Sequence, residues 1–156
     1  MVQGLIHELK YNGRKELGAC LGRWYGHDLK SSDLFAGVDA VVPVPLHPRK
    51  MRKRGYNQSA WIAKGLAESL GIPCLEDALL RVKYTETQTR KSRYARWENV
   101  KDIFAVNPKN KLVGKHVLLV DDIITTGATI EACSHTLLAV PVASLRVASV
   151  GYTDKN

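Results

Sequence analysis

Apolar residues along this chain follow two patterns, a recurrence every three to four residues in some segments and short uninterrupted runs in others. The first pattern predicts amphipathic helices, and the second predicts buried strands. A helical face is expected near residues 5–9, where Leu5, Ile6 and Leu9 lie, and a second helix is expected over 14–29. Four large residues at helical spacing predict the inward side of that second helix: Leu17, Leu21, Trp24 and Tyr25.

Five segments have the character of strands. The run 38–44 is cut off by two prolines, which stop strand pairing. The runs 79–82 and 103–106 are short, and 142–150 is rich in β-branched residues. The clearest strand is 117–120, a continuous apolar run typical of a strand buried on both faces of a parallel sheet.

Helices are predicted between these strands. Asn57 is a suitable N-cap for a helix that ends at Gly71, and 127–139 predicts another helix. Because strands alternate with helices, the sequence predicts an α/β fold with a mainly parallel, twisted sheet flanked by helices. Its 156 residues fit a single domain, 1–156.

Composition narrows the class of protein. Hydrophobic residues make up 45% and charged residues 24%, as in ordinary globular domains. No apolar run approaches the roughly 20 residues that cross a bilayer, the N-terminus lacks a secretory pattern, and the three cysteines are far apart. A cytoplasmic protein without a membrane segment is expected. The net charge of +8 indicates either an anionic partner or a solubilising surface.

The most informative segment is 117–129. A buried strand leads into Asp121 and Asp122, a turn rich in Thr and Gly follows, and a helix then begins. In an open parallel sheet, ligands bind beyond the carboxyl ends of strands, and a helix N-terminus attracts phosphate. The acids would accept ribose hydroxyls or a metal, and the turn would hold a phosphate, as a ribose 5-phosphate requires. Alternatively, these residues act only as turn and cap residues.

The whole string resembles the phosphoribosyl pyrophosphate (PRPP) motif of type I phosphoribosyltransferases. The resemblance implies the fold of those enzymes, with Asp121 and Asp122 as the catalytic residues that hold the ribose hydroxyls. The implied 5-phosphate ligands are Thr125, Thr126, Gly127, Ala128 and Thr129. Members that act on hypoxanthine or guanine have an Asp where this chain has Thr125, so such a base is disfavoured and no general base is apparent.

A basic run follows the first predicted strand. Five Lys or Arg lie within 49–54, without an acid, and they form either a solvated surface or a pyrophosphate site rich in Arg donors. The segments Pro43–Pro45 and Arg54–Gln58, with Arg49, resemble the ComF/GntX family of type I phosphoribosyltransferase-like proteins. The resemblance implies that five residues of this loop bind pyrophosphate: Arg49, Lys50, Arg52, Lys53 and Arg54.

A polar segment over 81–100 is predicted to be a loop. It matches the family pattern at Thr85, Gln88, Arg96, Asn99 and Val100. The resemblance implies the flexible loop that closes over PRPP, with four residues: Thr85, Gln88, Arg90 and Arg96. The alternative is an ordinary basic surface loop. Residues 1–36 are expected to form N-terminal helices, a candidate for a reduced form of the hood that recognises the nucleophile, without the zinc region of many members.

The function that the resemblance implies is a Mg²⁺-dependent transfer of the 5-phosphoribosyl group to a nitrogen nucleophile, with release of pyrophosphate. PRPP would carry the Mg²⁺, with Asp121 and Asp122 as candidate protein ligands. One alternative is a sensor of PRPP or nucleotides that performs no catalysis. Another is a competence protein for DNA uptake, which binds single-stranded DNA or a DNA-processing protein through its basic segments. The sequence does not give the oligomeric state, and a homodimer is a candidate because type I relatives are commonly dimers.

Overall fold

A computed structural model describes residues 15–83 and 103–153 of the chain. The expected helical face at 5–9 and most of the polar segment 81–100 lie outside these ranges. The elements in chain order are α2 (Lys15–Lys30), η1 (Asp33–Phe35), β1 (Ala40–Pro43), α3 (Pro48–Arg54), α4 (Gln58–Leu70), β2 (Leu79–Arg81), β3 (Phe104–Val106), β4 (His116–Ile124), α6 (Ala128–Leu138) and β5 (Ser144–Tyr152). In the described parts of the chain, no helix is both long and apolar enough to traverse a membrane.

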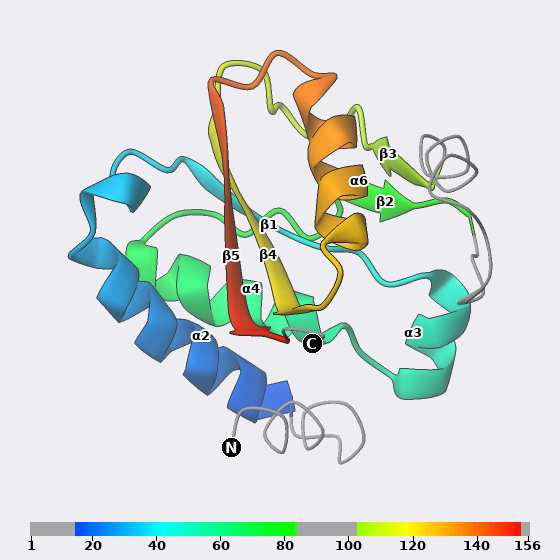
Figure 1. The fold of residues 1–156 in the computed structure, drawn as a ribbon, viewed down its shortest axis with the longest axis horizontal. Helices are drawn as coiled ribbons and strands as arrows, with labels where there is room; N and C mark the ends of the chain where they lie inside the picture. Colours follow the sequence, from blue (N-terminus) through cyan, green and yellow to red (C-terminus); the bar gives the residue numbers. More distant parts are fainter. Residues whose placement is uncertain (1–14, 84–102, 154–156) are drawn as a thin grey trace.

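The main sheet is parallel, as predicted, with the order β1-β4-β5 (Figure 1). Cys74 extends it by one parallel bridge to Val41 on the outer side of β1. The chain therefore goes from β1 outward to Cys74, and later returns to β4 on the other side of β1. Such a reversal of strand order opens a crevice at the carboxyl ends of the two strands, where open α/β sheets bind ligands. Here that place is between β1 and β4.

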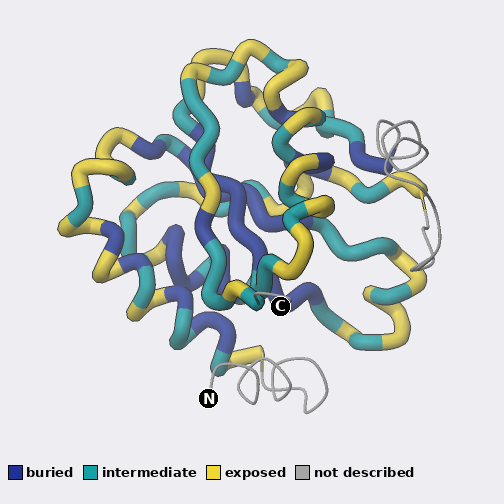
Figure 2. Tube along the Cα trace, in the orientation of Figure 1, coloured by how far each residue is buried: buried dark blue, intermediate teal, exposed yellow. Residues whose placement is uncertain are grey.

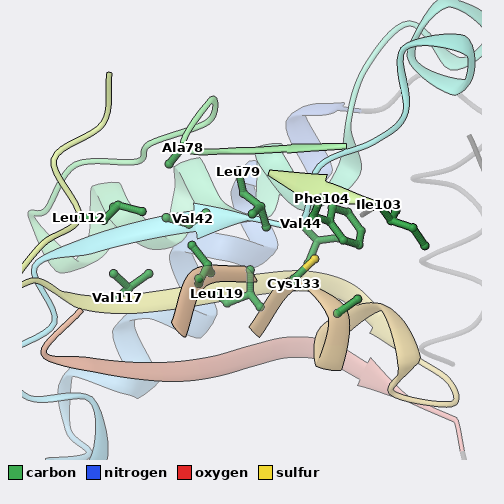
Figure 3. Packing of buried hydrophobic residues seen from close by; sticks show 12 residues of the cluster. Val42, Val44, Ala78, Leu79, Ile103, Phe104, Leu112, Val117, Leu119 and Cys133 are labelled. Carbon is green, nitrogen blue, oxygen red and sulfur yellow. The ribbon is translucent and has the colours of Figure 1, made fainter. Parts of the chain in front are cut away.

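Helices cover both faces of this sheet, and alternate strand residues face each layer. Figure 3 shows the layer that joins the sheet to α6, and a second layer joins the sheet to α4. Buried residues run along the central strands in Figure 2. Toward α6 point Val42, Val117 and Leu119, while Val41, Leu118 and Val120 pack with residues of α4. The continuous apolar run at 117–120 is thus explained by burial on two faces, as expected.

The inward face of α2 differs from the prediction. Trp24 is 67% exposed, and Leu17 and Leu21 are only partly buried, whereas Gly18, Gly22 and Gly26 are buried. A Cβ on Gly22 would lie 2.1 Å from the carbonyl oxygen of Ile62 in α4. The two helix backbones therefore meet through small residues, and this close approach leaves Trp24 outside the contact. Tyr25 is the one predicted residue that packs against the α4 layer.

Two further elements differ from the prediction: β4 is longer than the predicted strand, and the basic run has another secondary structure. The strand β4 does not end at Val120, because it continues through both acids and pairs with β5 as far as Ile124. The basic run is a short helix, α3, rather than a loop. His47 caps its start through Nδ1, Pro48 is its first residue, and Gly55 ends it with a φ of 85°. The predicted caps of α4, Asn57 and Gly71, are both confirmed.

Candidate functional site at the carboxyl edge of the sheet

The carboxyl ends of β1 and β4 bring together segments that are far apart in the sequence. After β1, the amide of Val44 still donates to the carbonyl of Val120, at 2.8 Å. The chain then forms α3 and the start of α4, where the Asn57 side chain donates to the carbonyl of Val44 at 2.9 Å. The first turn of α4 is thereby fixed beside Asp121, the first acid of β4.

Asp121 is an almost buried carboxylate, with 8% of its surface exposed. Its Oδ1 accepts a hydrogen bond of 3.0 Å from the hydroxyl of Ser59, on the first turn of α4. Burial, and next the charge of Asp122, raise the pKa of Asp121 to about 7, although the Ser59 hydrogen bond acts in the opposite direction. A carboxylate kept in so costly a setting is typical of a functional site.

Asp122 lies next to Asp121 and is partly exposed. Its backbone amide donates to Oδ1 of Asp121 at 2.9 Å and to the Ser59 hydroxyl at 3.2 Å. Its own Oδ1 accepts from the amide of Ile123 at 2.9 Å. Ser59 therefore contacts both acids, although sequence reasoning did not select it. The available signal was its position two residues after the Asn57 cap, at the predicted ligand edge.

The turn 125–129 follows β4 directly and leads into α6 (Figure 1). Gly127 has a φ of 78°, a left-handed conformation that favours glycine, and it is the residue before the helix. The side chains of Thr125, Thr126 and Thr129 are exposed. The turn thus presents hydroxyls and the N-terminal amides of α6 at the same edge as the acids. This arrangement suits a phosphate, because the positive end of a helix dipole attracts anions.

The five basic residues of α3 lie beyond the end of β1 (Figure 1). Because a helix turns by about 100° per residue, they cover a broad arc and do not all face one point. Arg49, Arg52 and Lys53 are exposed, whereas Lys50 and Arg54 are partly buried. Arg54 donates to Oε1 of Gln58 at 2.9 Å, which ties the end of α3 to the start of α4.

Arg81 adds a cation to this region that was not among the predicted site residues. It ends β2 and lies 5.6 Å from the ring centre of Phe104, its partner on β3. Lost hydration, and then the charges of Arg81 and of Arg49, Arg52 and Lys50 on α3, lower the pKa of His47. The ribbon β2–β3 thus brings positive charge toward α3. A signal for Arg81 was its place at the end of a predicted strand.

The four predicted residues of the flexible loop, Thr85, Gln88, Arg90 and Arg96, lie outside the described residues. The described ends of that segment meet across the β2–β3 ribbon, where the amide of Val82 donates to the carbonyl of Ile103 at 2.8 Å. Within 15–83 and 103–153, no group of three or more His, Cys, Asp or Glu side chains could hold a metal ion.

Comparison with known families and curated proteins agrees with this geometry. The phosphoribosyl transferase domain family matches residues 57–155, which include the acids and the turn. The chain is 33% identical over 146 residues to the DNA utilization protein YhgH of Salmonella typhi, covering 92% of this chain and 63% of that protein. It is 38% identical over 121 residues to competence protein F of Haemophilus influenzae, covering 77% and 53%. It thus spans less than two thirds of these relatives' length.

Solved structures give the same fold. Glutamine PRPP amidotransferase from B. subtilis, complexed with ADP and GMP, has a TM-score of 0.58, with 23% identity over 85% of this chain and 26% of that one. An adenine phosphoribosyltransferase has a TM-score of 0.53, with 18% identity over 92% and 72% of the two chains. The predicted type I fold is thereby confirmed, as is the resemblance to ComF proteins, since a 33% identical segment occurs in competence protein ComFC of Bacillus subtilis, covering 63% and 38% of the two chains.

Proposed function

Because this chain belongs to the phosphoribosyl transferase domain family, we propose that it binds PRPP at the carboxyl edge of β4 and transfers the 5-phosphoribosyl group to a nitrogen nucleophile. One observation carries this proposal. The acid pair Asp121–Asp122 lies on the central strand β4 and is fixed by the hydroxyl of Ser59 on α4. Three residues after Asp122, the chain enters the turn before α6. A ribose 5-phosphate needs acceptors for its hydroxyl groups close to hydrogen-bond donors for its phosphate.

The two acids have different tasks in this proposal. Asp121 is held by Ser59 and is nearly buried, so it fixes the position of the pair, while the more exposed Asp122 faces the ligand edge. Together they accept the ribose hydroxyls. Their negative charge also favours the positive charge that develops on the ribose ring when the bond to pyrophosphate breaks. The turn 125–129 holds the 5-phosphate and sets the direction of the sugar.

Pyrophosphate is the leaving group, and positive charge beyond β1 would stabilise it. Arg54 and Lys50 lie on α3, and Arg81 on β2 is close enough to His47, at the start of α3, for its charge to lower the pKa of that imidazole. We propose that these three cations bind the pyrophosphate. Mg²⁺ fits this chemistry, because it prefers oxygen ligands, commonly takes several from phosphates, and would neutralise the leaving charge. The more exposed Asp122 is the described residue that would complete its coordination.

The acceptor is proposed to be neither hypoxanthine nor guanine. Members that act on those bases carry an acid where this chain has Thr125, whose side chain is exposed and has no titratable group. The transfer forms a carbon–nitrogen bond at the anomeric carbon as the carbon–oxygen bond to pyrophosphate breaks. A loop that covers PRPP, as proposed for 81–100, would exclude water from that carbon.

A second candidate function is related to DNA. The relatives are named for competence and for DNA utilization, and the exposed face of α3 carries Arg49, Arg52 and Lys53. Such a face suits the phosphate backbone of single-stranded DNA. The two functions differ in salt dependence, because DNA binding weakens steeply with salt, whereas PRPP binding should require Mg²⁺.

Two variants test the proposed division of the site. We expect Asp121→Asn to weaken ribose 5-phosphate and PRPP while leaving pyrophosphate affinity unchanged, because the acids hold the sugar. The double variant Lys50→Ala, Arg54→Ala should weaken pyrophosphate by about 10-fold or more and ribose 5-phosphate little, since charge-assisted bonds contribute roughly 1.5–3 kcal/mol each. Calorimetric titration with Mg²⁺ measures all three ligands. Lys111→Ala, an exposed cation before β4, is the control.

Equal losses for all three ligands in either variant would contradict this division of roles. No measurable affinity of the unmodified protein for PRPP would contradict the proposed function itself.

A further inference from the structure

Gln58 is the first residue of α4, and it is almost completely buried, with 2% of its surface exposed. Its two neighbours in the sequence, Asn57 and Ser59, both make hydrogen bonds that hold the site together. Asn57 binds the carbonyl of Val44 after β1, and Ser59 binds Asp121 on β4. Gln58 binds Arg54 of α3. Three consecutive side chains thus join α4 to the end of β1, to the basic helix and to the acid pair.

The orientation of the Gln58 amide follows from its partner. Arg54 has only donors, so the amide must present Oε1 to it, and the 2.9 Å bond has that sense. Nε2 is therefore directed away from Arg54. It is buried, and it has no hydrogen-bond partner within residues 15–83 and 103–153. Buried donors almost always have a hydrogen-bond partner. A buried donor without one, beside a ligand site, therefore indicates that the ligand supplies the acceptor.

We propose that Gln58 is a further ligand-binding residue of this site, which orients Arg54 through Oε1 and donates from Nε2 to an oxygen of the diphosphate group of the ligand. This inference rests on the proposed function, since the site must take a phosphorylated sugar with a diphosphate. An anionic oxygen is the partner that the position favours, because Nε2 is a donor, α4 presents its N-terminus here, and the neighbouring α3 is basic.

Two substitutions of similar shape separate the two atoms of the amide. Gln58→Glu keeps an oxygen for Arg54 but loses the donor, and Gln58→Met loses both. If Nε2 binds the ligand, both variants should bind inorganic pyrophosphate and PRPP, each with Mg²⁺, about 10- to 100-fold more weakly than the unmodified protein. Asp121→Asn serves as the comparison, because it should lose affinity for PRPP and not for pyrophosphate.

A direct readout needs neither variant. The chain has three glutamines, Gln3, Gln58 and Gln88, so protein labelled with ¹⁵N-glutamine gives three pairs of side-chain amide signals. Gln3→Met and Gln88→Met assign the Gln58 signal by elimination, even if changes at position 58 impair folding. We expect the Gln58 signal to shift when pyrophosphate and Mg²⁺ are added, and the thermal midpoints without ligand report on any loss of structure.

Each outcome decides the matter. Full affinity in Gln58→Glu with loss in Gln58→Met would leave only the orienting role of Oε1 and overturn the donor role. Full affinity in both, or an unmoved Gln58 signal in protein that binds pyrophosphate, would overturn the inference while the proposed function stands. Absence of binding by the unmodified protein would overturn the proposed function, and this role with it.

Discussion

At the scale of single residues, Asp121 is the site residue whose charged form the surrounding structure disfavours. Its carboxylate is nearly buried next to a second acid, and one hydroxyl, that of Ser59, offsets part of the cost. A group whose charged form is disfavoured by folding makes stability depend on pH. This cost also favours binding, because a ligand that brings hydroxyl groups or a cation stabilises the buried carboxylate.

The first prediction concerns stability and pH. Because the pKa of Asp121 is raised in the folded state, the folded protein binds its proton before the unfolded chain does as the pH falls from about 7 to about 4. The free energy of unfolding should therefore decrease as the pH rises through this window. Asp121→Asn removes the charge and should be more stable than the unmodified protein by on the order of 2–4 kcal/mol at pH 8.

Urea unfolding at pH 8 and pH 4, without ligand, measures this difference. We expect most of the advantage of Asp121→Asn to disappear at pH 4, where Asp121 is protonated in the folded state and partly protonated in the unfolded chain. The same difference at both pH values, or a loss of stability at pH 8, would contradict the cause given for the raised pKa.

The second prediction concerns Ser59. Its hydroxyl lowers the pKa of Asp121, so Ser59→Ala should raise that pKa further. If PRPP binds the ionised acid, the pH at which binding is half-maximal should move up by roughly one unit. Titrations between pH 5.5 and 9 test this expectation, and Ser69→Ala, near the other end of α4, is the matched control. A uniform loss of affinity at every pH would show that Ser59 acts only through packing.

At the scale of elements, the close contact of α2 with α4 decides how the N-terminal part attaches to the sheet. Gly22 of α2 contacts the backbone of α4, and Gly65 of α4 contacts the backbone of α2. A Cβ on Gly65 would lie 2.0 Å from the carbonyl oxygen of Ala19. Both helices must therefore keep glycine at the crossing. Tyr25 and Leu29 then reach the layer between α4 and the sheet.

The third prediction follows from this crossing. Gly22→Ala should destabilise the protein by about 2–3 kcal/mol, because the new methyl group would overlap the Ile62 carbonyl and force the helices apart. Trp24→Ala, two residues further along α2 and 67% exposed, should cost less than about 1 kcal/mol. Urea unfolding of both variants measures the two costs. A larger cost for Trp24→Ala would restore the inward face that periodicity predicted.

The difference between prediction and structure in α2 has a physical cause. Periodicity identifies large apolar residues as core, but it contains no information about how near the partner helix comes. For α3 the signals were present, since a capping His47, Pro48 at the first position and Gly55 at the end together indicate a helix. The resemblance to type I phosphoribosyltransferases instead implies a loop for this run.

At the scale of the whole molecule, the fold was predictable because its strands and helices alternate and the central strand is apolar throughout. The acid pair and the turn were predictable because they are contiguous in sequence. Ser59 and Gln58 act through partners that only the fold brings close, since Ser59 and Asp121 are 62 residues apart in the chain. Such contacts leave little trace in a local pattern.

The whole molecule is arranged around the reversal of strand order between β1 and β4. One strand leads to the basic helix and the start of α4, and the other leads through the acids to the turn before α6. The basic residues of α3, after β1, and the acids of β4 thus lie at one edge of the sheet. A molecule with a diphosphate at one end and a phosphate at the other, joined by a sugar, matches this order.

The most direct test of this account is the thermal midpoint of the full chain with saturating PRPP, measured with and without Mg²⁺. At about 100 times its dissociation constant, PRPP should stabilise the folded protein by about 2.7 kcal/mol, which raises the midpoint by several degrees. We expect this shift to require Mg²⁺ and to be lost in Asp121→Asn. No shift with both PRPP and Mg²⁺ present, or the same shift in Asp121→Asn, would contradict a PRPP site at the acid pair.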